Sequence, residues 1–82
     1  MEFYRKRFSG LDTNELYGIL KLRFDVFVLE QECLYQEIDN LDQDAIHVYI
    51  KDGDEIVAYL RVLDRGVESE DVAIGRVIAK KR

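Results

Sequence analysis

The sequence contains one cysteine and one histidine, and it has neither proline nor tryptophan. A single cysteine excludes an intramolecular disulfide and fits a protein of a reducing compartment. No apolar run approaches the length that spans a bilayer, and no charged-then-apolar leader opens the chain. We therefore expect a cytoplasmic protein with no membrane partner.

The size and charge of the chain narrow its class further. Its 82 residues suffice for one small domain, which would bury about 60% of its unfolded surface. Hydrophobic residues make up 48% and charged residues 35%, as in a soluble globular protein. The net charge of -5 argues against nucleic acid as a partner, because that binding needs a clustered cationic surface. Basic residues gather only in residues 5–7 and 80–82, whereas residues 30–44 hold acids and no lysine or arginine.

An alternating segment, residues 3–8, predicts a first strand with Tyr4 and Phe8 on one face and Phe3 on the other. The pair Ser9-Gly10 follows it directly. Because glycine and serine favour turns, we expect the strand to end there.

A helix is predicted next. Asp12 or Thr13 can cap its start, and Glu15 stands three residues after Asp12, as in a capping box. Hydrophobic side chains then recur at helical spacing and predict the buried stripe of the helix. The members of this stripe are Leu16, Leu20, Phe24 and Phe27. Arg23 and Asp25 fall outside it.

The rest of the chain predicts a loop and three strands. Residues 30–44 show no period and predict a loop with one short helical turn at most. Alternation then places Ile46, Val48 and Ile50 on one strand face and His47 and Tyr49 on the other. Residues 51–54, Lys-Asp-Gly-Asp, predict a hairpin turn. Residues 56–63 are apolar on both faces apart from Arg61, as in a strand covered on both sides, and residues 72–79 predict the last strand. The order β-α-loop-β-β-β predicts an α+β fold.

Four segments of the chain carry a family resemblance. Residues 22–31 read Leu-Arg-Phe-Asp-Val-Phe-Val-Leu-Glu-Gln, and residues 33–39 read Cys-Leu-Tyr-Gln-Glu-Ile-Asp. Residues 58–63, Ala-Tyr-Leu-Arg-Val-Leu, and residues 74–78, Ile-Gly-Arg-Val-Ile, follow in order. Together they resemble the GCN5-related N-acetyltransferases, specifically the ElaA-like branch, in which Pro is usual where this chain has Leu34.

The resemblance covers nearly the whole chain and implies a mixed, mainly antiparallel sheet. The glycine-rich loop that cradles the cofactor phosphates, its helix and the later strands of the family do not follow. We therefore expect residues 1–82 to be the amino-terminal portion of a single acetyltransferase domain, truncated before the phosphate loop. If these residues are the entire molecule, we expect no detectable turnover.

The resemblance also implies a cofactor, acetyl-CoA as co-substrate. In this family the pantetheine arm lies beside the fourth strand and pairs with its free backbone groups. By that resemblance, Val77, Ile78 and Ala79 would contact the arm through their main chain, and Arg82 would be the first residue of the phosphate loop.

Two neighbouring features have both a functional and a plain explanation. Residues 80–82, Lys-Lys-Arg, would offset phosphate charge, but a solvated strand end gives the same pattern. Gly75 would either mark a bulge that opens the strand from its neighbour or be required by close packing.

The reaction implied is attack of a primary amine on the thioester, with no covalent enzyme intermediate. It needs a neutral amine, a held carbonyl and a stabilised tetrahedral oxyanion. The catalytic residues stay unknown, and Glu30 and Asp39 are the candidates for the base. With Glu37 and Asp42, these carboxylates could attract a cationic amine and help take its proton. A hydrated loop with capping carboxylates explains the same acids.

Other residues that often carry chemistry have plain interpretations here. We expect His47 to be a packed or surface histidine of its strand and not a catalytic base. We expect Cys33 to be a small buried residue and not a nucleophile. The spacing of Asp39, Asp42 and Asp44 does not fit a calcium loop, so we expect no metal.

Three arginines, Arg23, Arg61 and Arg76, stand within otherwise apolar elements. Burying them unpaired would be costly, so we expect carboxylate partners such as Glu30 or Asp39. At least one such ion pair should link the helix end to the sheet.

Two other functions stay open. A non-catalytic sheet module would associate through its open last strand, residues 72–79, as in a homodimer. An acyltransferase of the homoserine-lactone-synthase type would share the general fold and depend on an acyl carrier protein. The acceptor amine is open as well: a small polyamine-like molecule, an amino sugar, a peptide amine or an antibiotic all fit.

Overall fold

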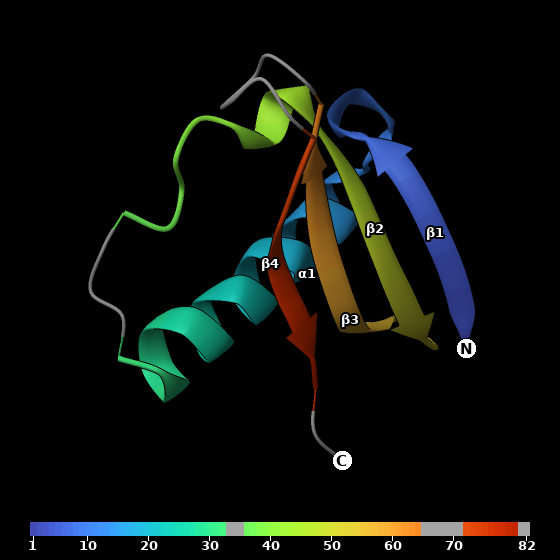
Figure 1. Cartoon of the computed structure of the whole chain (residues 1–82). Coiled ribbons are helices and arrows are strands. Elements are labelled where there is room, and N and C mark those ends of the chain that lie inside the picture. Colours follow the sequence, from blue (N-terminus) through green and yellow to red (C-terminus); the bar gives the residue numbers. More distant parts are fainter. Residues whose placement is uncertain (33–35, 65–71, 81–82) are drawn as a thin grey trace.

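The computed structural model describes residues 1–32, 36–64 and 72–80. They form a four-stranded antiparallel sheet in the order β1-β2-β3-β4, with one helix across one face (Figure 1). The strands are β1 (Glu2–Arg7), β2 (Ala45–Asp52), β3 (Glu55–Leu63) and β4 (Ala73–Ala79). The helices are η1 (Phe8–Gly10), α1 (Thr13–Arg23), η2 (Phe24–Glu30) and η3 (Asp42–Asp44). The predicted order of elements is confirmed.

The start of α1 is fixed by the predicted capping box. The Asp12 side chain accepts a hydrogen bond from the Glu15 backbone N–H at 2.7 Å, and the Glu15 carboxylate accepts one from the Asp12 N–H at 3.0 Å. At its other end α1 continues as the π-helix η2, in which Gln31 N–H donates to Val26 O at 3.0 Å. The predicted loop therefore begins only after Glu30.

The buried face of α1 differs from the predicted stripe. Ile19 and Leu22 are its buried hydrophobic side chains, and Glu15 and Arg23 are buried beside them. Leu16, Leu20 and Phe27 are half-buried, and Phe24 is 49% exposed. The predicted stripe was wrong because a hydrophobicity pattern leaves out charged residues, which can be buried when partners neutralise them.

The core lies between α1 and the sheet. Its buried members are Ile19, Leu22, Tyr49, Ile56, Tyr59 and Ile78. Tyr49 pairs with Tyr59, and Tyr59 with Ile78, so one row of side chains crosses three strands. Tyr4 of β1 stacks on Tyr49 with ring centroids 5.2 Å apart. The predicted alternation in β2 is confirmed, and its helix-facing side is the one with His47 and Tyr49, which are 0% and 1% exposed.

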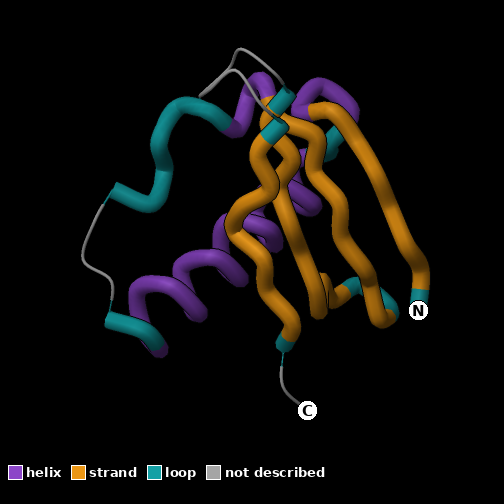
Figure 2. The backbone as a smooth tube through the Cα atoms, viewed as in Figure 1, coloured by secondary structure: helices purple, strands orange, loops and turns teal. Residues whose placement is uncertain are grey.

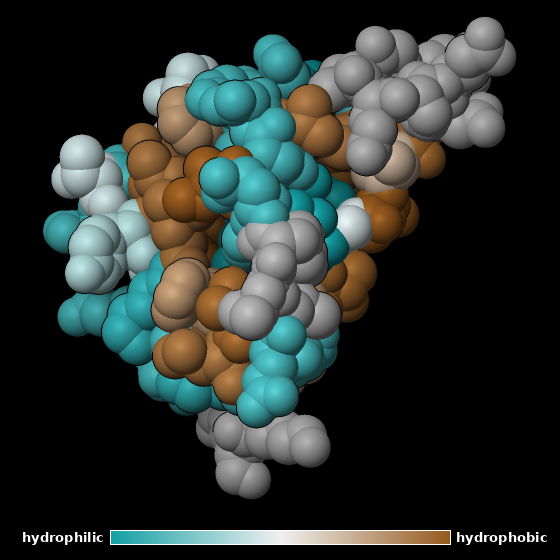
Figure 3. All heavy atoms as spheres, turned by 90° about the vertical axis from the view of Figure 1, so that its left-hand side faces the viewer, coloured by the Kyte–Doolittle hydropathy of each residue, from teal (hydrophilic) through white to brown (hydrophobic). Residues whose placement is uncertain are grey.

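The opposite face of the sheet carries hydrophobic side chains without a cover among the described elements. A shallow cavity of about 130 Å³ lies there, and Phe3, Val48 and Leu60 are among its lining residues. Phe3 is 68% and Val77 65% exposed. Figure 3 views the molecule from the side of the helix end and shows hydrophobic surface flanking a hydrophilic band. In the described part of the chain, β3 is thus covered on the helix side alone.

Two connections bring the later site together. The β2–β3 hairpin turns at Gly53-Asp54, where Gly53 has φ +66, and the hairpin prediction is confirmed. Figure 2 shows the chain leaving the helix end and rising beside the sheet to η3 at the start of β2. We call residues 36–44 of this path the acidic loop. Across the described ranges, no helix combines the length and apolarity needed to cross a membrane.

Candidate functional site

A buried set of ion pairs joins α1, the acidic loop and the sheet. We call it the ion cluster; its members are Arg23, Arg61, Arg76, Glu37, Asp39 and Asp42. The least buried side chain, that of Asp39, is 23% exposed, and that of Arg23 is 1% exposed. Three carboxylates thus balance three guanidinium groups away from solvent, which lets the charges be buried.

Glu37 is shared between two of the arginines. Arg23 Nε donates to Glu37 Oε1 at 2.5 Å, and Arg76 Nε donates to Glu37 Oε2 at 2.5 Å. Both Nη2 groups donate to the Glu37 carbonyl oxygen, at 3.0 Å from Arg23 and 3.1 Å from Arg76. One residue of the acidic loop therefore connects the end of α1 to strand β4.

The other two carboxylates connect the loop to β3. Asp42 Oδ1 accepts from Arg23 Nη1 at 2.7 Å and from Arg61 Nη1 at 2.9 Å. Arg61 also donates to both oxygens of Asp39, at 2.9 and 2.8 Å. These hydrogen bonds lower the pKa of Asp39 to about 2. The predicted ionic link between the helix end and the sheet is confirmed, but it runs through Glu37 and Asp42, whereas the expected partner Asp39 binds only the sheet arginines.

His47 lies against the ion cluster. Its Nε2 is 2.9 Å from the Asp42 carbonyl oxygen, and its Nδ1 is 2.6 Å from the Tyr59 hydroxyl. A carbonyl can only accept, so Nε2 carries the proton and Nδ1 accepts from Tyr59. Burial lowers the pKa of His47 and keeps it neutral. The prediction of a packed histidine is confirmed.

Strand β4 contains a bulge next to this cluster. Its pairing with β3 shifts between Tyr59 and Arg61, so that Arg76 and Val77 together face one residue of β3. Arg76 has φ +54, a left-handed conformation that is uncommon for a residue other than glycine. A bulge beside Gly75 was predicted and is present. Close packing does not explain Gly75, because a Cβ added there meets nothing within 4 Å in the described part of the chain.

The outer edge of β4 faces no other strand among the described residues. Lys80 N–H donates to Val57 O at 2.8 Å, and Ile78 pairs with Tyr59. Backbone groups of successive strand residues point to opposite sides. The N–H and C=O of Ala79, between Ile78 and Lys80, therefore point to the open edge.

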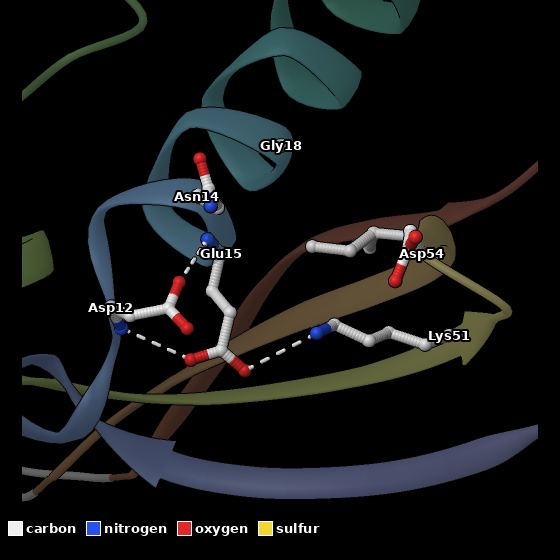
Figure 4. Close-up of a pocket in the computed structure, with 7 residues that line it drawn as sticks. Asp12, Asn14, Glu15, Gly18, Lys51 and Asp54 are labelled. Atoms are coloured by element: carbon white, nitrogen blue, oxygen red, sulfur yellow. Dashed lines mark hydrogen bonds and ion pairs between the residues drawn. The ribbon is translucent and has the colours of Figure 1, made fainter.

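A second polar site lies at the start of α1. A cavity of about 480 Å³ separates α1 from the β2–β3 hairpin, lined by Asp12, Asn14, Glu15, Gly18, Lys51, Asp54 and Ile56. Figure 4 shows the Glu15 carboxylate between the Asp12 backbone and the Lys51 ammonium. Lys6 Nζ and the Tyr49 hydroxyl also donate to it. Burial alone raises the pKa of Glu15, but bonds from Tyr49, Asp12 and Lys6 outweigh burial and lower it to about 2. Both oxygens are engaged by the protein itself, so this site is structural.

The chain is similar to several known proteins over nearly its whole length. No family model matches the chain. A UPF0039 protein of Schizosaccharomyces pombe is 40% identical over 79 residues, which is 95% of this chain and 51% of that protein. Protein ElaA of Escherichia coli is 45% identical over 75 residues, which is 89% of this chain and 49% of ElaA. The chain therefore spans about half the length of the curated relatives it matches.

Two solved structures share the fold. The crystal structure of Escherichia coli ElaA superposes with a TM-score of 0.90 at 43% identity, over 98% of this chain and 55% of that one. An acyl-CoA N-acyltransferase from Pseudomonas aeruginosa gives a TM-score of 0.90 at 41% identity, over 96% of this chain and 56% of that one. The chain is ElaA-like, with the fold of the GCN5-related N-acetyltransferases.

In this ElaA-like chain, the residues predicted to contact the cofactor lie in the last half of β4. The Val77 side chain is 65% exposed and that of Ile78 is 5% exposed, in the core. Lys80 is exposed at the strand end and pairs with Glu55 at 3.0 Å. Arg82, predicted to begin the phosphate loop, lies outside the described residues, as do Lys81 and Cys33.

The two candidate bases of this ElaA-like chain lie in different settings. Asp39 belongs to the ion cluster and contacts Arg76 of the β4 bulge at 3.3 Å, whereas Glu30 is an exposed residue at the end of η2. Sequence reasoning named neither Glu37 nor Asp42 as a partner of the arginines. The sequence did carry a signal for these partners. Three arginines in apolar segments need three anions when buried, and the acidic loop has carboxylates but no lysine or arginine.

Proposed function

We propose that this chain provides the acyl-CoA-binding strand of an N-acyltransferase, and that the complete gene product transfers acetyl from acetyl-CoA to a primary amine. The observation that carries the proposal is the outer edge of β4, which lies open among the described residues of a chain whose structural neighbours include an acyl-CoA N-acyltransferase. An amide-bearing pantetheine arm can pair with such an edge as an added strand would.

The arm would lie along Val77 and Ala79, with the Ala79 N–H and C=O as hydrogen-bonding groups. The thioester would then stand beside the bulge at Arg76 and Val77, where β4 departs from regular pairing. Backbone N–H groups at such a place can stabilise the oxyanion of a tetrahedral intermediate. Lys80 is exposed at the strand end where the phosphates would lie, and it would exchange its surface partner Glu55 for a phosphate there.

The chemistry follows in one displacement. The amine nitrogen forms a bond to the acyl carbon and gives the tetrahedral oxyanion. The carbon–sulfur bond then breaks, and coenzyme A leaves as its thiolate. The amine proton passes to a base or to water. Asp39, held ionised by Arg61 and Arg76 with a pKa near 2, is a weak proton acceptor. Glu30 is exposed and stays the candidate base on this chain.

Three carboxylates of the acidic loop contribute little net charge to amine binding. Glu37, Asp39 and Asp42 are each paired with an arginine. The acceptor would therefore be selected by residues other than these three.

A pair of variants at one position tests the cofactor edge. Ala79→Pro removes the outward N–H without removing a bond to β3, and proline is tolerated where the N–H faces away from the sheet. Ala79→Ser changes the side chain and keeps the N–H. Acetyl-CoA titrations followed by calorimetry should show roughly tenfold weaker binding by Ala79→Pro, the equivalent of one lost hydrogen bond, and near-normal binding by Ala79→Ser.

The outcome also separates the alternatives. No binding of acetyl-CoA by the unmodified complete gene product, or equal binding by Ala79→Pro, contradicts the proposal. A dimer that Ala79→Pro dissociates would favour the open edge as a contact between chains. Turnover with an acyl carrier protein but not with acetyl-CoA would favour the synthase-type acyltransferase.

A further inference from the structure

We propose that Glu37 and Arg76 are a positioning pair, which sets the bulge of β4 where the acyl-CoA would lie and couples that bulge to the acidic loop. This inference rests on the proposed function. It adds residues that touch neither acyl group nor amine but determine where the strand presents its backbone.

The first step is the backbone of Arg76. Its φ of +54 is a conformation that costs free energy for a residue with a Cβ, so surrounding contacts must hold it. Gly75, the neighbouring residue for which that conformation would be free of strain, does not adopt a positive φ. The side chain of Arg76 is therefore the reason that the strained residue stands here.

The second step is the set of hydrogen bonds that fixes the Arg76 side chain. Arg76 Nε donates to Glu37 Oε2 at 2.5 Å, and Nη2 donates to the Glu37 carbonyl at 3.1 Å. Two bonds from one planar guanidinium fix its direction as well as its distance. The Arg76 side chain is 16% exposed and that of Glu37 8% exposed, so solvent screens the pair weakly.

The third step is the rigidity of Glu37 itself. Its other carboxylate oxygen and its carbonyl are held by Arg23, at the end of α1. Next to the bulge, Arg61 pairs in register with Gly75 and binds Asp39 of the same loop, and Asp39 also lies 3.3 Å from Arg76. The acidic loop thus contacts the bulge at Arg76 and the facing strand at Arg61, so a movement of the loop should displace the bulge.

The consequence is a coupling that can be measured. Acetyl-CoA on the β4 edge should slow amide hydrogen exchange in residues 36–44, although these residues lie on a different element. The reverse also follows, since linkage between two sites is reciprocal. If the pair is lost, the β4 edge should still bind acetyl-CoA, but the thioester should lie in the wrong place.

The test uses the complete gene product with acetyl-CoA as the probe. In Glu37→Gln, we expect acetyl-CoA affinity to change less than about threefold, kcat to fall about tenfold, and the slowing of exchange in residues 36–44 to disappear. Arg76→Gly should behave in the same way, because glycine adopts the left-handed backbone without strain and removes the side chain that binds Glu37. It also serves if Glu37→Gln does not fold. Asp25→Asn, which removes an exposed ion pair with Lys21, is the control and should retain the slowing.

Each failure has its own meaning. If the unmodified protein does not bind acetyl-CoA, the proposed function is contradicted and this inference falls with it. If acetyl-CoA binds and Glu37→Gln or Arg76→Gly keeps both kcat and the slowing in residues 36–44, the positioning pair alone is contradicted.

Discussion

Arg23 and Glu37 form a buried ion pair across 14 positions of the chain, with Arg23 Nε 2.5 Å from Glu37 Oε1. Their side chains are 1% and 8% exposed. Removing one partner of such a pair leaves the other charge buried without compensation, at a cost of about 3–5 kcal/mol. We expect Arg23→Met to lower the free energy of unfolding by that order, as measured by urea denaturation.

The same site distinguishes geometry from charge. Arg23→Lys keeps the charge, but one ammonium cannot reach Glu37 and Asp42 with the spread of the Nε, Nη1 and Nη2 contacts. We expect it to recover only part of the stability. Lys21→Met, on the exposed side of α1, should change the free energy of unfolding little. If Arg23→Met were as mild as Lys21→Met, the ion cluster would not be holding the fold together.

A second prediction concerns Glu15 in acid. Its pKa of about 2 lies below the value of 4.5 for an unperturbed carboxyl, so its charged form stabilises the folded chain. This contribution is complete above pH 4.5 and is lost as the pH falls toward 2; its size is about 3 kcal/mol. Glu15→Gln should therefore be less stable at pH 6 and approach the parent near pH 2. A stability difference that does not vary with pH would contradict this assignment.

A third prediction concerns His47 as the pH falls below 6.5. Burial lowers its pKa from 6.5, so the unfolded chain binds a proton that the folded chain resists. Stability is then complete above pH 6.5 and declines as the pH falls below it, by at most about 1.4 kcal/mol per pH unit. Denaturation at pH 7.5 and pH 5.5 measures this slope, and His47→Asn should remove it. A variant with an unchanged slope would show that other groups titrate in this window.

A fourth prediction compares two glycines. Gly53 has φ +66 in the β2–β3 turn, so Gly53→Ala should destabilise the protein by about 1 kcal/mol. Gly75 has no positive φ and meets nothing within 4 Å of an added Cβ in the described residues. We therefore expect Gly75→Ala to leave the stability unchanged or slightly higher in thermal denaturation. Equal losses at the two positions would mean that β4 needs the glycine for a reason outside its backbone conformation.

Local patterns predicted the elements of this fold well. The strand alternation around His47, the hairpin at Gly53 and the capping box of Asp12 with Glu15 are each confirmed. Each depends on residues close together in the chain, whose preferences act whatever surrounds them. The resemblance to the ElaA-like branch is confirmed by the comparisons.

The buried face of α1 could not be predicted in the same way. Leu16 and Phe24 fit a helical stripe, yet Glu15 and Arg23 are more buried than either. Charged side chains enter a core only when partners arrive from elsewhere in the sequence, as Glu37 and Asp42 do for Arg23. A periodicity analysis contains no information about those partners.

The amino-acid order by itself determined which segments form strands and helix, because backbone propensity, capping and side-chain alternation act over a few residues. Tertiary structure alone decided that Glu37 divides its carboxylate between Arg23 and Arg76, and that Arg76 takes the left-handed backbone at the bulge. The physical reason is that buried charges and strained backbone are stable only when groups distant in the chain compensate them. Which carboxylate meets which arginine depends on the path of the acidic loop beside the sheet.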